Sequence, residues 1–400
     1  MSNTMYQTIT NKIDAAHDDL KTLALSLHEH PELAFQEHFA CKSLSAILEK
    51  YGYQVKTNIA GMETAFIGEL RGKDGGPTVA LLAEYDALPM GHACGHNLIA
   101  TMSIGAAIGI AEVLKDLCGR VLVIGTPAEE GGGGKVIMCD AGIFRDVDFA
   151  MMIHPHKRNL IQRGGLAVKH LTIEYFGKPA HGTRPEEGIN ALSSVIHTFN
   201  FMDAQRALLP FKSNVNGYII EGGKASNIIP EYASCEFCIR GDIVKDLLVV
   251  EKAMYRATDT ANLLFGTTSK VKAGLMYTER YSNRAMDETY KKHMESMGEV
   301  VEYPEPNMKY GSSDIGNVSL EVPTIQPYLK IGDRDTHTHE FAELTKSDHA
   351  IEQAVKGAKA LALTACDILT SPELQKQIKD EFKAKVPHYT REELGYHTQI

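Results

Sequence analysis

The spacing of apolar side chains divides the first part of the chain into helix and strand. Between residues 8 and 52, apolar positions recur three and four apart, which predicts helix, and Gly52 marks its end. The stretch TAFIGELRGKDGGPTVALLAEY follows and predicts two strands around a DGGP turn. The second strand is almost continuously apolar, which indicates burial on both faces of a sheet.

Strand and helix then alternate as far as residue 156. A helix is predicted over residues 97–116, and buried strands are predicted in RVLVIG and in DFAMMIHPH. This order predicts an α/β domain in which a mixed or parallel sheet is flanked by helices.

The pattern changes near residue 165, where strands begin to alternate apolar and polar residues. Residues 166–281 predict a βαββαβ order, which is typical of a small ferredoxin-like α+β domain. The α/β pattern returns after residue 282 and ends in the long helix KSDHAIEQAVKGAKALALTACDILT and a charged tail. We therefore predict a larger domain formed by residues 1–165 and 282–400, with residues 166–281 inserted into it.

Charge and composition exclude several classes of protein. The 400 residues carry a net charge of -10 and no block of Lys or Arg, which argues against a nucleic-acid partner. No apolar run approaches the roughly 18 residues that cross a membrane, so no membrane partner is expected. The N-terminal MSNTMYQTITNKIDAAHDDL lacks an apolar signal core, which predicts a cytoplasmic protein. Seven scattered cysteines do not form a disulfide framework.

Side chains that bind metals recur just beyond the predicted strands. Ligands of open α/β sheets bind outside the carboxyl ends of the strands, so these side chains are expected to meet there. Three buried strands each deliver a His, Cys or carboxylate at this point, which predicts a metal site. The candidates are His92, Cys94 and His96; Glu129 and Glu130; His154 and His156; His181; and His337 with His339.

The adjacent carboxylates Glu129 and Glu130 precede four glycines. One carboxylate could bind a metal while the other acts as a general base on a metal-bound water. The alternative is a solvated acidic turn. The glycines would let a substrate approach the loop, but no Lys-Ser/Thr follows them as in a phosphate-binding loop, so nucleotide binding is not expected.

Seven blocks of the sequence resemble one family. They are EYDALP…GHACGHN, PAEEGG, IHP, KPAHGTRPEEGINAL, GGKASNIIPEY, YGSSDIGNVS and HTHEF. In this order they resemble the co-catalytic zinc aminoacylase/carboxypeptidase family of metallopeptidases. The similar branch has a Cys-Gly-His motif and includes indole-acetyl-amino-acid hydrolases, aminobenzoyl-glutamate hydrolases and β-alanyl-lysine-type dipeptidases. The resemblance implies a dinuclear-metallopeptidase domain with an inserted lid and dimerisation domain.

The resemblance also implies a set of metal ligands. Cys94 matches the ligand that bridges two metals, and four residues match ligands of a single metal: His96, Glu130, His154 and His337. Two divalent ions per subunit are implied, with zinc as the expected metal and manganese or cobalt as alternatives.

Five further residues match catalytic or substrate-binding positions. Glu129 matches the general base, and Asp86 matches a carboxylate near the metals. His181 matches a histidine that steadies the tetrahedral intermediate, often across a dimer. Asn227 lies in a segment that helps to bind the substrate carboxylate, and Arg240 is a second candidate for that role.

The first motif departs from that of more distant relatives. They place a His two residues before Asp86, where this chain has Glu84, so the ligand role passes to His96. Asn97 stands where plant-type relatives have Asp, which favours the aminobenzoyl-glutamate and dipeptidase side of the branch.

Three further histidines and a second role for the Cys94 thiol are the remaining alternatives. His92 is expected to brace its loop through a hydrogen bond. His156 could line the site, and His339 is the alternative to His337 as the last ligand. Cys94 could instead be a nucleophile, which would require a neighbouring His as base and no metal.

The sequence therefore predicts a metal-dependent amide hydrolase. Its expected substrate is a small N-acyl amino acid or a dipeptide with a free carboxylate, attacked by a metal-bridging water with Glu129 as base. A homodimer or higher homo-oligomer is expected from the resemblance. The alternative is a non-catalytic paralogue that binds metal and ligand.

Overall fold

The computed structural model describes residues 2–398, which form two compact units. Unit 1 comprises residues 2–164, Arg280–His388 and residue 398; unit 2 comprises Gly165–Glu279 and Tyr389–His397. The expected inserted range was 166–281, and residues 1, 399 and 400 of the expected larger domain lie outside the described residues. Residues Tyr389–His397 were expected in the larger domain but belong to unit 2. There the Tyr389 hydroxyl donates a hydrogen bond to Glu279 Oε1 at 2.7 Å.

Unit 1 begins with three helices rather than one long helical stretch. They are α1 (Ser2–Ala15), α2 (His17–Glu29) and α3 (His38–Lys50). Pro31 follows directly after the C-cap of α2, where a proline disfavours further helix. The strand β1 (Gln54–Ile59) comes next and was not predicted, because most of its side chains are exposed and it lacks a buried face.

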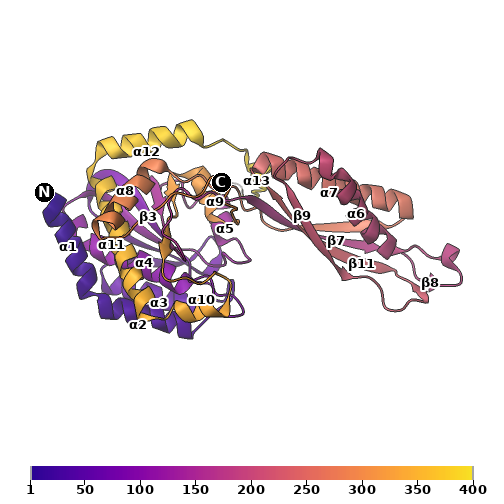
Figure 1. Ribbon diagram of the computed structural model, residues 1–400, viewed down its shortest axis with the longest axis horizontal. Coiled ribbons are helices and arrows are strands. Elements are labelled where there is room, and N and C mark those ends of the chain that lie inside the picture. The colour runs from indigo at the N-terminus through magenta and orange to yellow at the C-terminus, as the bar shows by residue number, and fades with distance from the viewer. Residues whose placement is uncertain (1, 399–400) are drawn as a thin grey trace. The chain divides into compact units, whose positions relative to one another are not determined.

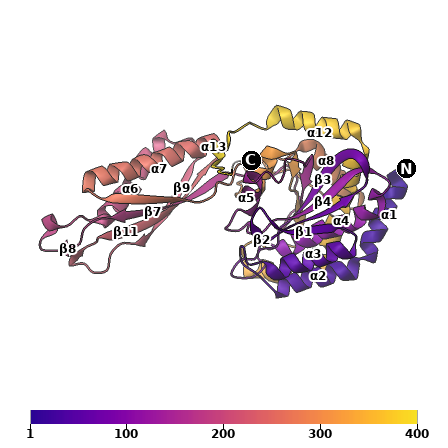
Figure 2. The same ribbon diagram turned by 180° about the vertical axis from the view of Figure 1, so that it is seen from behind.

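A mixed six-stranded sheet forms the centre of unit 1, in the order β1-β2-β4-β3-β5-β13 (Figures 1 and 2). Its further strands are β2 (Met62–Arg71), β3 (Lys73–Ala83), β4 (Cys118–Gly125), β5 (Phe149–Met151) and β13 (Thr324–Ile325). The neighbouring strands β4, β3, β5 and β13 are parallel to one another. Strand β2 is antiparallel to both of its neighbours, β1 and β4. The sheet confirms the predicted fold class, although β4 lies between β2 and β3 and the DGGP residues belong to β3.

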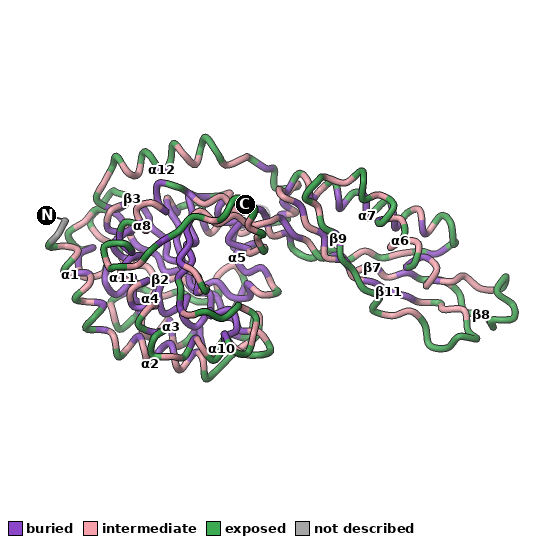
Figure 3. Tube along the Cα trace, viewed as in Figure 1, coloured by how far each residue is buried: buried purple, intermediate pink, exposed green. Residues whose placement is uncertain are grey.

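Helix α4 (His96–Leu114) is buried along nearly its whole length (Figure 3). It packs against β3, α1 and α11 (Asp348–Thr370). The expectation that no apolar run could span a membrane was wrong in one respect, because α4 is long and apolar enough by length and composition. Its apolar window is 89% buried inside the structure, as in the core helix of a folded domain.

The remaining elements of unit 1 surround the sheet. They are α5 (Gly134–Asp140), β6 (His154–His156), α8 (Arg284–Ser296), α9 (Ile315–Glu321), β14 (Tyr328–Lys330), α10 (His339–Leu344) and α12 (Pro372–Lys385). Strands β6 and β14 pair in parallel. The charged C-terminal tail is largely helical as α12, whose first turn is capped by the Ser371 side chain.

Unit 2 has a four-stranded antiparallel sheet in the order β12-β7-β11-β9. Its elements are β7 (Ala167–Phe176), α6 (Ala191–Gln205), β9 (Asn214–Glu221), β11 (Tyr232–Gly241), α7 (Val244–Phe265) and β12 (Thr268–Ala273). They follow the predicted βαββαβ order. The short strands β8 (Ala180–His181) and β10 (Ile228–Ile229) pair with each other, Pro185–Glu187 and Arg206–Leu208 are 3₁₀ turns, and α13 (Arg391–Leu394) belongs to the C-terminal segment.

Candidate metal centre

The Cys-Gly-His turn at the start of α4 requires its glycine. Gly95 has φ +83°, and a Cβ at this position would lie 2.9 Å from Cγ of Pro155. A side chain there would be strained and would also clash with the segment that carries His154. The turn leaves Cys94 8% exposed and His96 fully buried.

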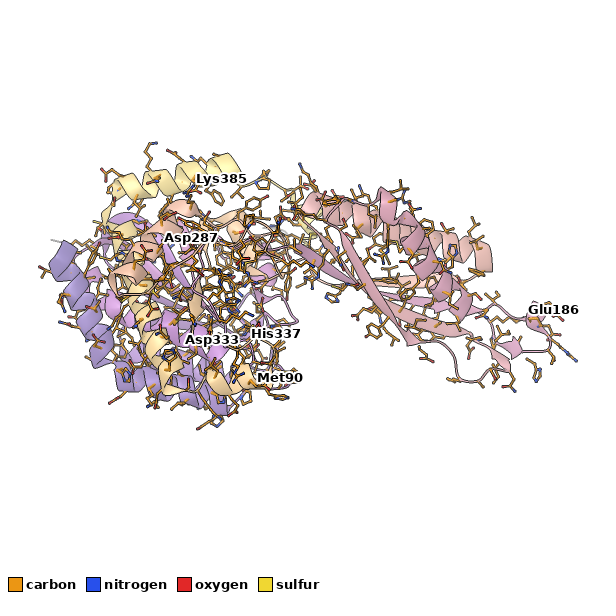
Figure 4. The ribbon with its side chains drawn as sticks, viewed as in Figure 1. Met90, Glu186, Asp287, Asp333, His337 and Lys385 are labelled. Atoms are coloured by element: carbon orange, nitrogen blue, oxygen red, sulfur yellow. The ribbon has the colours of Figure 1, made fainter. Side chains whose placement is uncertain are left out.

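The thiol of Cys94 lies between two imidazoles. Its Sγ is 3.3 Å from Nε2 of His154 and 3.5 Å from Nε2 of His337. His154 begins β6, and His337 lies in the loop before α10, where Figure 4 labels it. His337 has φ +65°, and its N–H donates to the carbonyl of Ala93 at 2.8 Å. The strained backbone therefore ties the last candidate ligand to the loop of the first.

Asp86 orients two other candidate ligands. The Nδ1 of His96 lies 2.8 Å from the carbonyl and 3.0 Å from Oδ1 of Asp86, and Oδ2 accepts the N–H of Glu130 at 2.9 Å. With Nδ1 held by Asp86, Nε2 is the ring nitrogen of His96 that is left to bind a metal. This Nε2 is buried without a hydrogen-bond partner, 3.6 Å from Glu84 Oε2 and 4.0 Å from Glu129 Oε2. A buried ring nitrogen that has no hydrogen-bond partner fits a metal ligand.

A buried carboxylate braces the loop that carries Glu129 and Glu130. Ala128 has φ +61°, and its N–H donates to Oε1 of Glu37 at 2.9 Å. Glu37 is fully buried and also accepts from Phe35 N and Thr64 Oγ1. Glu37 was not predicted as a site residue, because it lies between α2 and α3, far in sequence from the glycine loop.

The candidate ligand atoms form four overlapping groups, each with all its atoms within 4.8 Å of one another. The groups are Cys94-His96-His154, Cys94-Glu130-His337, His96-Glu129-Glu130 and Glu84-Glu129-Asp314. The first two share Cys94, as a bridging thiolate between two metals would require. The donor set therefore fits two metal ions, and all five predicted metal ligands converge.

Burial is the main influence on the pKa values at this centre. It lowers the pKa of His154 well below its ordinary value, so this imidazole is neutral and able to bind a metal. It raises the pKa of the Cys94 thiol, and with help from Glu84, Asp314 and Glu130 it raises the pKa of Glu129. A divalent cation would offset both effects by stabilising the anions.

The fourth group already contains a cation from the protein. Nζ of Lys135 lies 2.6 Å from Glu84 Oε1 and 2.7 Å from Asp314 Oδ1, and all three side chains are fully buried. Burial opposes the ammonium charge, but the two carboxylates raise the pKa of Lys135 above its ordinary value. This ion cluster was not predicted, although Lys135 follows the glycines and Asp314 lies in the block YGSSDIGNVS.

Three histidines of unit 1 that the sequence made candidates, His92, His156 and His339, lie outside these ligand groups. His92 is 2% exposed, and its Nε2 is 3.0 Å from the carbonyl of Leu27, which confirms the predicted loop brace. The ring of His156 packs edge-on against Tyr328, and His339 is an exposed residue at the start of α10.

The three site residues predicted outside unit 1 lie in unit 2. His181 pairs with Ile228 across β8 and β10, and the Gly182 N–H donates to the carbonyl of Asn227 at 2.7 Å, so His181 and Asn227 are neighbours. Figure 4 labels the nearby Glu186 in the turn after β8. Arg240 lies near the other end of β11, about 25 Å along the strand from Tyr232, and does not join them.

Comparison with known proteins identifies relatives along most of the chain. The model of "Peptidase family M20/M25/M40" matches residues 80–366. Xaa-Arg dipeptidase from Mus musculus is 35% identical over 394 residues, which cover 94% of this chain and 91% of that protein. A p-aminobenzoyl-glutamate hydrolase chain from Escherichia coli is 28% identical over 71% of this chain and 63% of its own length. These matches confirm the family resemblance.

Solved structures share the fold. A dinuclear metal binding peptidase of the M20 family from Bacillus subtilis aligns with TM-score 0.67 and 21% identity, covering 88% of this chain and 99% of its own. An aminobenzoyl-glutamate utilization protein from Klebsiella pneumoniae aligns with TM-score 0.70 and 18% identity, covering 88% of this chain and 97% of its own.

The shared thiolate predicts unequal effects of removing single ligands. Cys94→Ala should lose most of both metals, whereas His337→Ala should lose about one ion, because only Cys94 belongs to both groups. His339→Ala is the matched control and should keep the wild-type content. Elemental analysis of the purified variants measures the ratio of metal to protein. Wild-type metal content in Cys94→Ala would contradict the bridging role.

Proposed function

The chain belongs to peptidase family M20/M25/M40 and is an amide-bond hydrolase, and we propose that its substrate is a dipeptide or a small N-acyl amino acid. The convergence of Cys94, His96, Glu130, His154 and His337 beside Glu129 carries the proposal. Both substrate classes share one scissile amide and one free carboxylate.

The names of the relatives support this choice. The mouse and human relatives are Xaa-Arg dipeptidases and match nearly the whole chain, so a dipeptide that ends in arginine is the first substrate to test. The alternative of a non-catalytic paralogue is not supported, since the relatives are named as enzymes and the candidate general base Glu129 is retained.

We propose zinc as the resident metal, with two ions per chain. A buried thiolate with imidazole and carboxylate ligands suits zinc, and manganese or cobalt are the alternatives. The metals, when bound, would polarise the amide carbonyl and lower the pKa of a bound water toward neutral pH.

Glu129 is proposed as the proton carrier of the reaction. It would accept a proton from the attacking water and deliver it to the leaving amine, so that hydroxyl joins the acyl group and hydrogen joins the amine. Its position on a loop braced by Glu37 and its distance of 4.0 Å from His96 support this role. Asp86 would hold the imidazole and the loop in place, and His181 of unit 2 is proposed to donate to the developing oxyanion.

We also propose that two chains associate through unit 2. Strand β9 is an edge of the four-stranded sheet, and it exposes Tyr218, Ile219 and Ile220. An exposed apolar edge strand is a template for pairing with a second copy. A cytoplasmic location stays a prediction of the sequence.

Removing the proposed proton carrier should separate chemistry from binding. Glu129→Gln keeps the shape of the side chain but cannot accept the proton, so kcat for alanyl-arginine should fall by about 10²–10⁴-fold while metal content is unchanged. Steady-state kinetics and elemental analysis measure the two quantities. The exposed Glu63→Gln serves as the control and should behave as wild type. Wild-type turnover in Glu129→Gln would exclude this mechanism.

A charge on the edge strand should prevent association. Ile220→Lys places an ammonium on β9, where pairing with a second strand would desolvate it. We expect sedimentation to give twice the chain mass for wild type and a single chain for the variant, with Val249→Lys on α7 as an exposed apolar control. Association of Ile220→Lys as strong as that of wild type would place the interface elsewhere.

A further inference from the structure

Lys135 fills one of the four groups of ligand-type residues with its own ammonium. That group is the carboxylate trio of Glu84, Glu129 and Asp314, whose ligand atoms lie within 4.8 Å of one another. Nζ of Lys135 donates to Asp314 Oδ1 at 2.7 Å and forms an ion pair with Glu84 Oε1 at 2.6 Å. Divalent cations bind carboxylate oxygens at about 2.0–2.6 Å, so a second cation cannot lie between the same two oxygens.

The backbone fixes the ammonium at this position. A Cβ at Gly134 would lie 2.0 Å from the carbonyl oxygen of Pro127, so the glycine lets α5 begin directly beside the loop that carries Glu129. Asp314 Oδ2 accepts the N–H of Lys135 at 2.9 Å, while its Oδ1 accepts the ammonium. One carboxylate thus binds both the backbone and the side chain of Lys135.

The carboxylate trio differs from the other three groups in its members. Each of those groups contains at least two of the proposed metal ligands, whereas the trio contains none of them. Among the groups found in the described residues, the trio is therefore the one that could hold a third ion independently of the other two.

A third ion in the trio would interfere with the proposed reaction. It would take Glu129, the proposed proton carrier, as a ligand. A carboxylate bound to a divalent cation is a weaker base, because the cation stabilises its anion. Turnover therefore requires that this group stay without a metal.

We infer that Lys135 is a positioning residue that keeps a third metal ion out of the carboxylate trio, so that Glu129 stays available for proton transfer. This inference rests on the proposed function, in which Glu129 carries the proton. An ammonium suits the task because it has no lone pair and cannot bind a metal. It compensates the buried charge of Glu84 and Asp314, as a metal would, from a side chain tethered to α5.

Uptake of Mn²⁺ by the zinc-loaded, full-length enzyme tests this inference. A group that offers only oxygen atoms suits Mn²⁺, and Mn²⁺ does not displace zinc from thiolate and imidazole ligands. In Lys135→Met, which has an apolar side chain of similar length, we expect about one additional Mn²⁺ per chain with zinc unchanged. Zinc-loaded wild type should take up none. Elemental analysis counts both metals, and the EPR signal of unbound Mn²⁺ follows the titration.

The additional ion should also reduce turnover. Before Mn²⁺ is added, kcat of zinc-loaded Lys135→Met for alanyl-arginine should lie within about tenfold of wild type. Saturating Mn²⁺ should then lower this kcat by at least about tenfold and change KM by less than about twofold, because Glu129 becomes a ligand. Wild-type kcat should not respond to Mn²⁺. Lys135→Arg keeps the positive charge and should exclude Mn²⁺ as wild type does.

Two control variants separate exclusion of the ion from a general loss of buried charge. The double variant Lys135→Met, Asp314→Asn removes one carboxylate of the trio and should bind no additional Mn²⁺. Lys169→Met removes a lysine that is paired with Glu251 at 2.7 Å in unit 2, and it should bind none either.

The inference is overturned if Lys135→Met takes up no Mn²⁺, or if the added Mn²⁺ leaves its kcat unchanged. Loss of turnover in Lys135→Met before Mn²⁺ is added would also overturn it, because Lys135 would then act through the fold. If Lys135→Met does not fold, the wild-type titration remains decisive. One equivalent of Mn²⁺ bound to zinc-loaded wild type, with loss of turnover, would show that the ammonium does not exclude the ion.

The outcomes also distinguish this inference from the proposed function. Hydrolysis of alanyl-arginine by wild type, without Mn²⁺ uptake by Lys135→Met, overturns the inference alone. Mn²⁺ uptake that depends on the loss of Lys135, in an enzyme that hydrolyses neither dipeptides nor N-acyl amino acids, overturns the proposed function while the exclusion of the third ion stands.

Discussion

Buried negative charge is the constraint on which the arrangement of unit 1 depends. Glu84, Asp86, Glu129 and Asp314 all lie below the surface at one region of the structure. Carboxylates in such surroundings are stable only when cations or hydrogen-bond donors lie beside them. Lys135 supplies one ammonium, and the N–H groups of His96 and the Glu130 backbone supply donors to Asp86. The remaining carboxylates lie beside Cys94 and the histidines, in the groups that we propose to hold metal ions.

The sheet explains how residues distant in sequence reach this region. Strands β3, β4 and β5 are parallel, and the chain leaves each of them at the same edge of the sheet. Asp86 follows β3, Glu129 follows β4 and His154 follows β5. The left-handed residues Gly95, Ala128 and His337 then turn the chain sharply where ligands are needed. Among the described residues, two of the six left-handed non-glycine positions, Ala128 and His337, thus lie in segments that carry candidate ligands.

The sequence predicted the parts of this site that depend on local patterns. The apolar runs of β3, β4 and β5, and the ligand-type residue after each run, were sufficient to predict the metal site. Glu37 and the Lys135–Asp314 pair could not be predicted, because their roles arise from contacts between segments 91 and 179 residues apart. The exposed strand β1 was missed because no buried alternation marks it.

The central claim is that turnover depends on metal ions held by Cys94 and its neighbours, and not on the Cys94 thiol as a nucleophile. Protein stripped with EDTA and then titrated with Zn²⁺ tests this directly, with hydrolysis of alanyl-arginine as the readout. We predict no turnover in EDTA, and a rise to a plateau at about two equivalents of zinc per chain. Full turnover in EDTA would contradict the account and would assign the chemistry to the thiol.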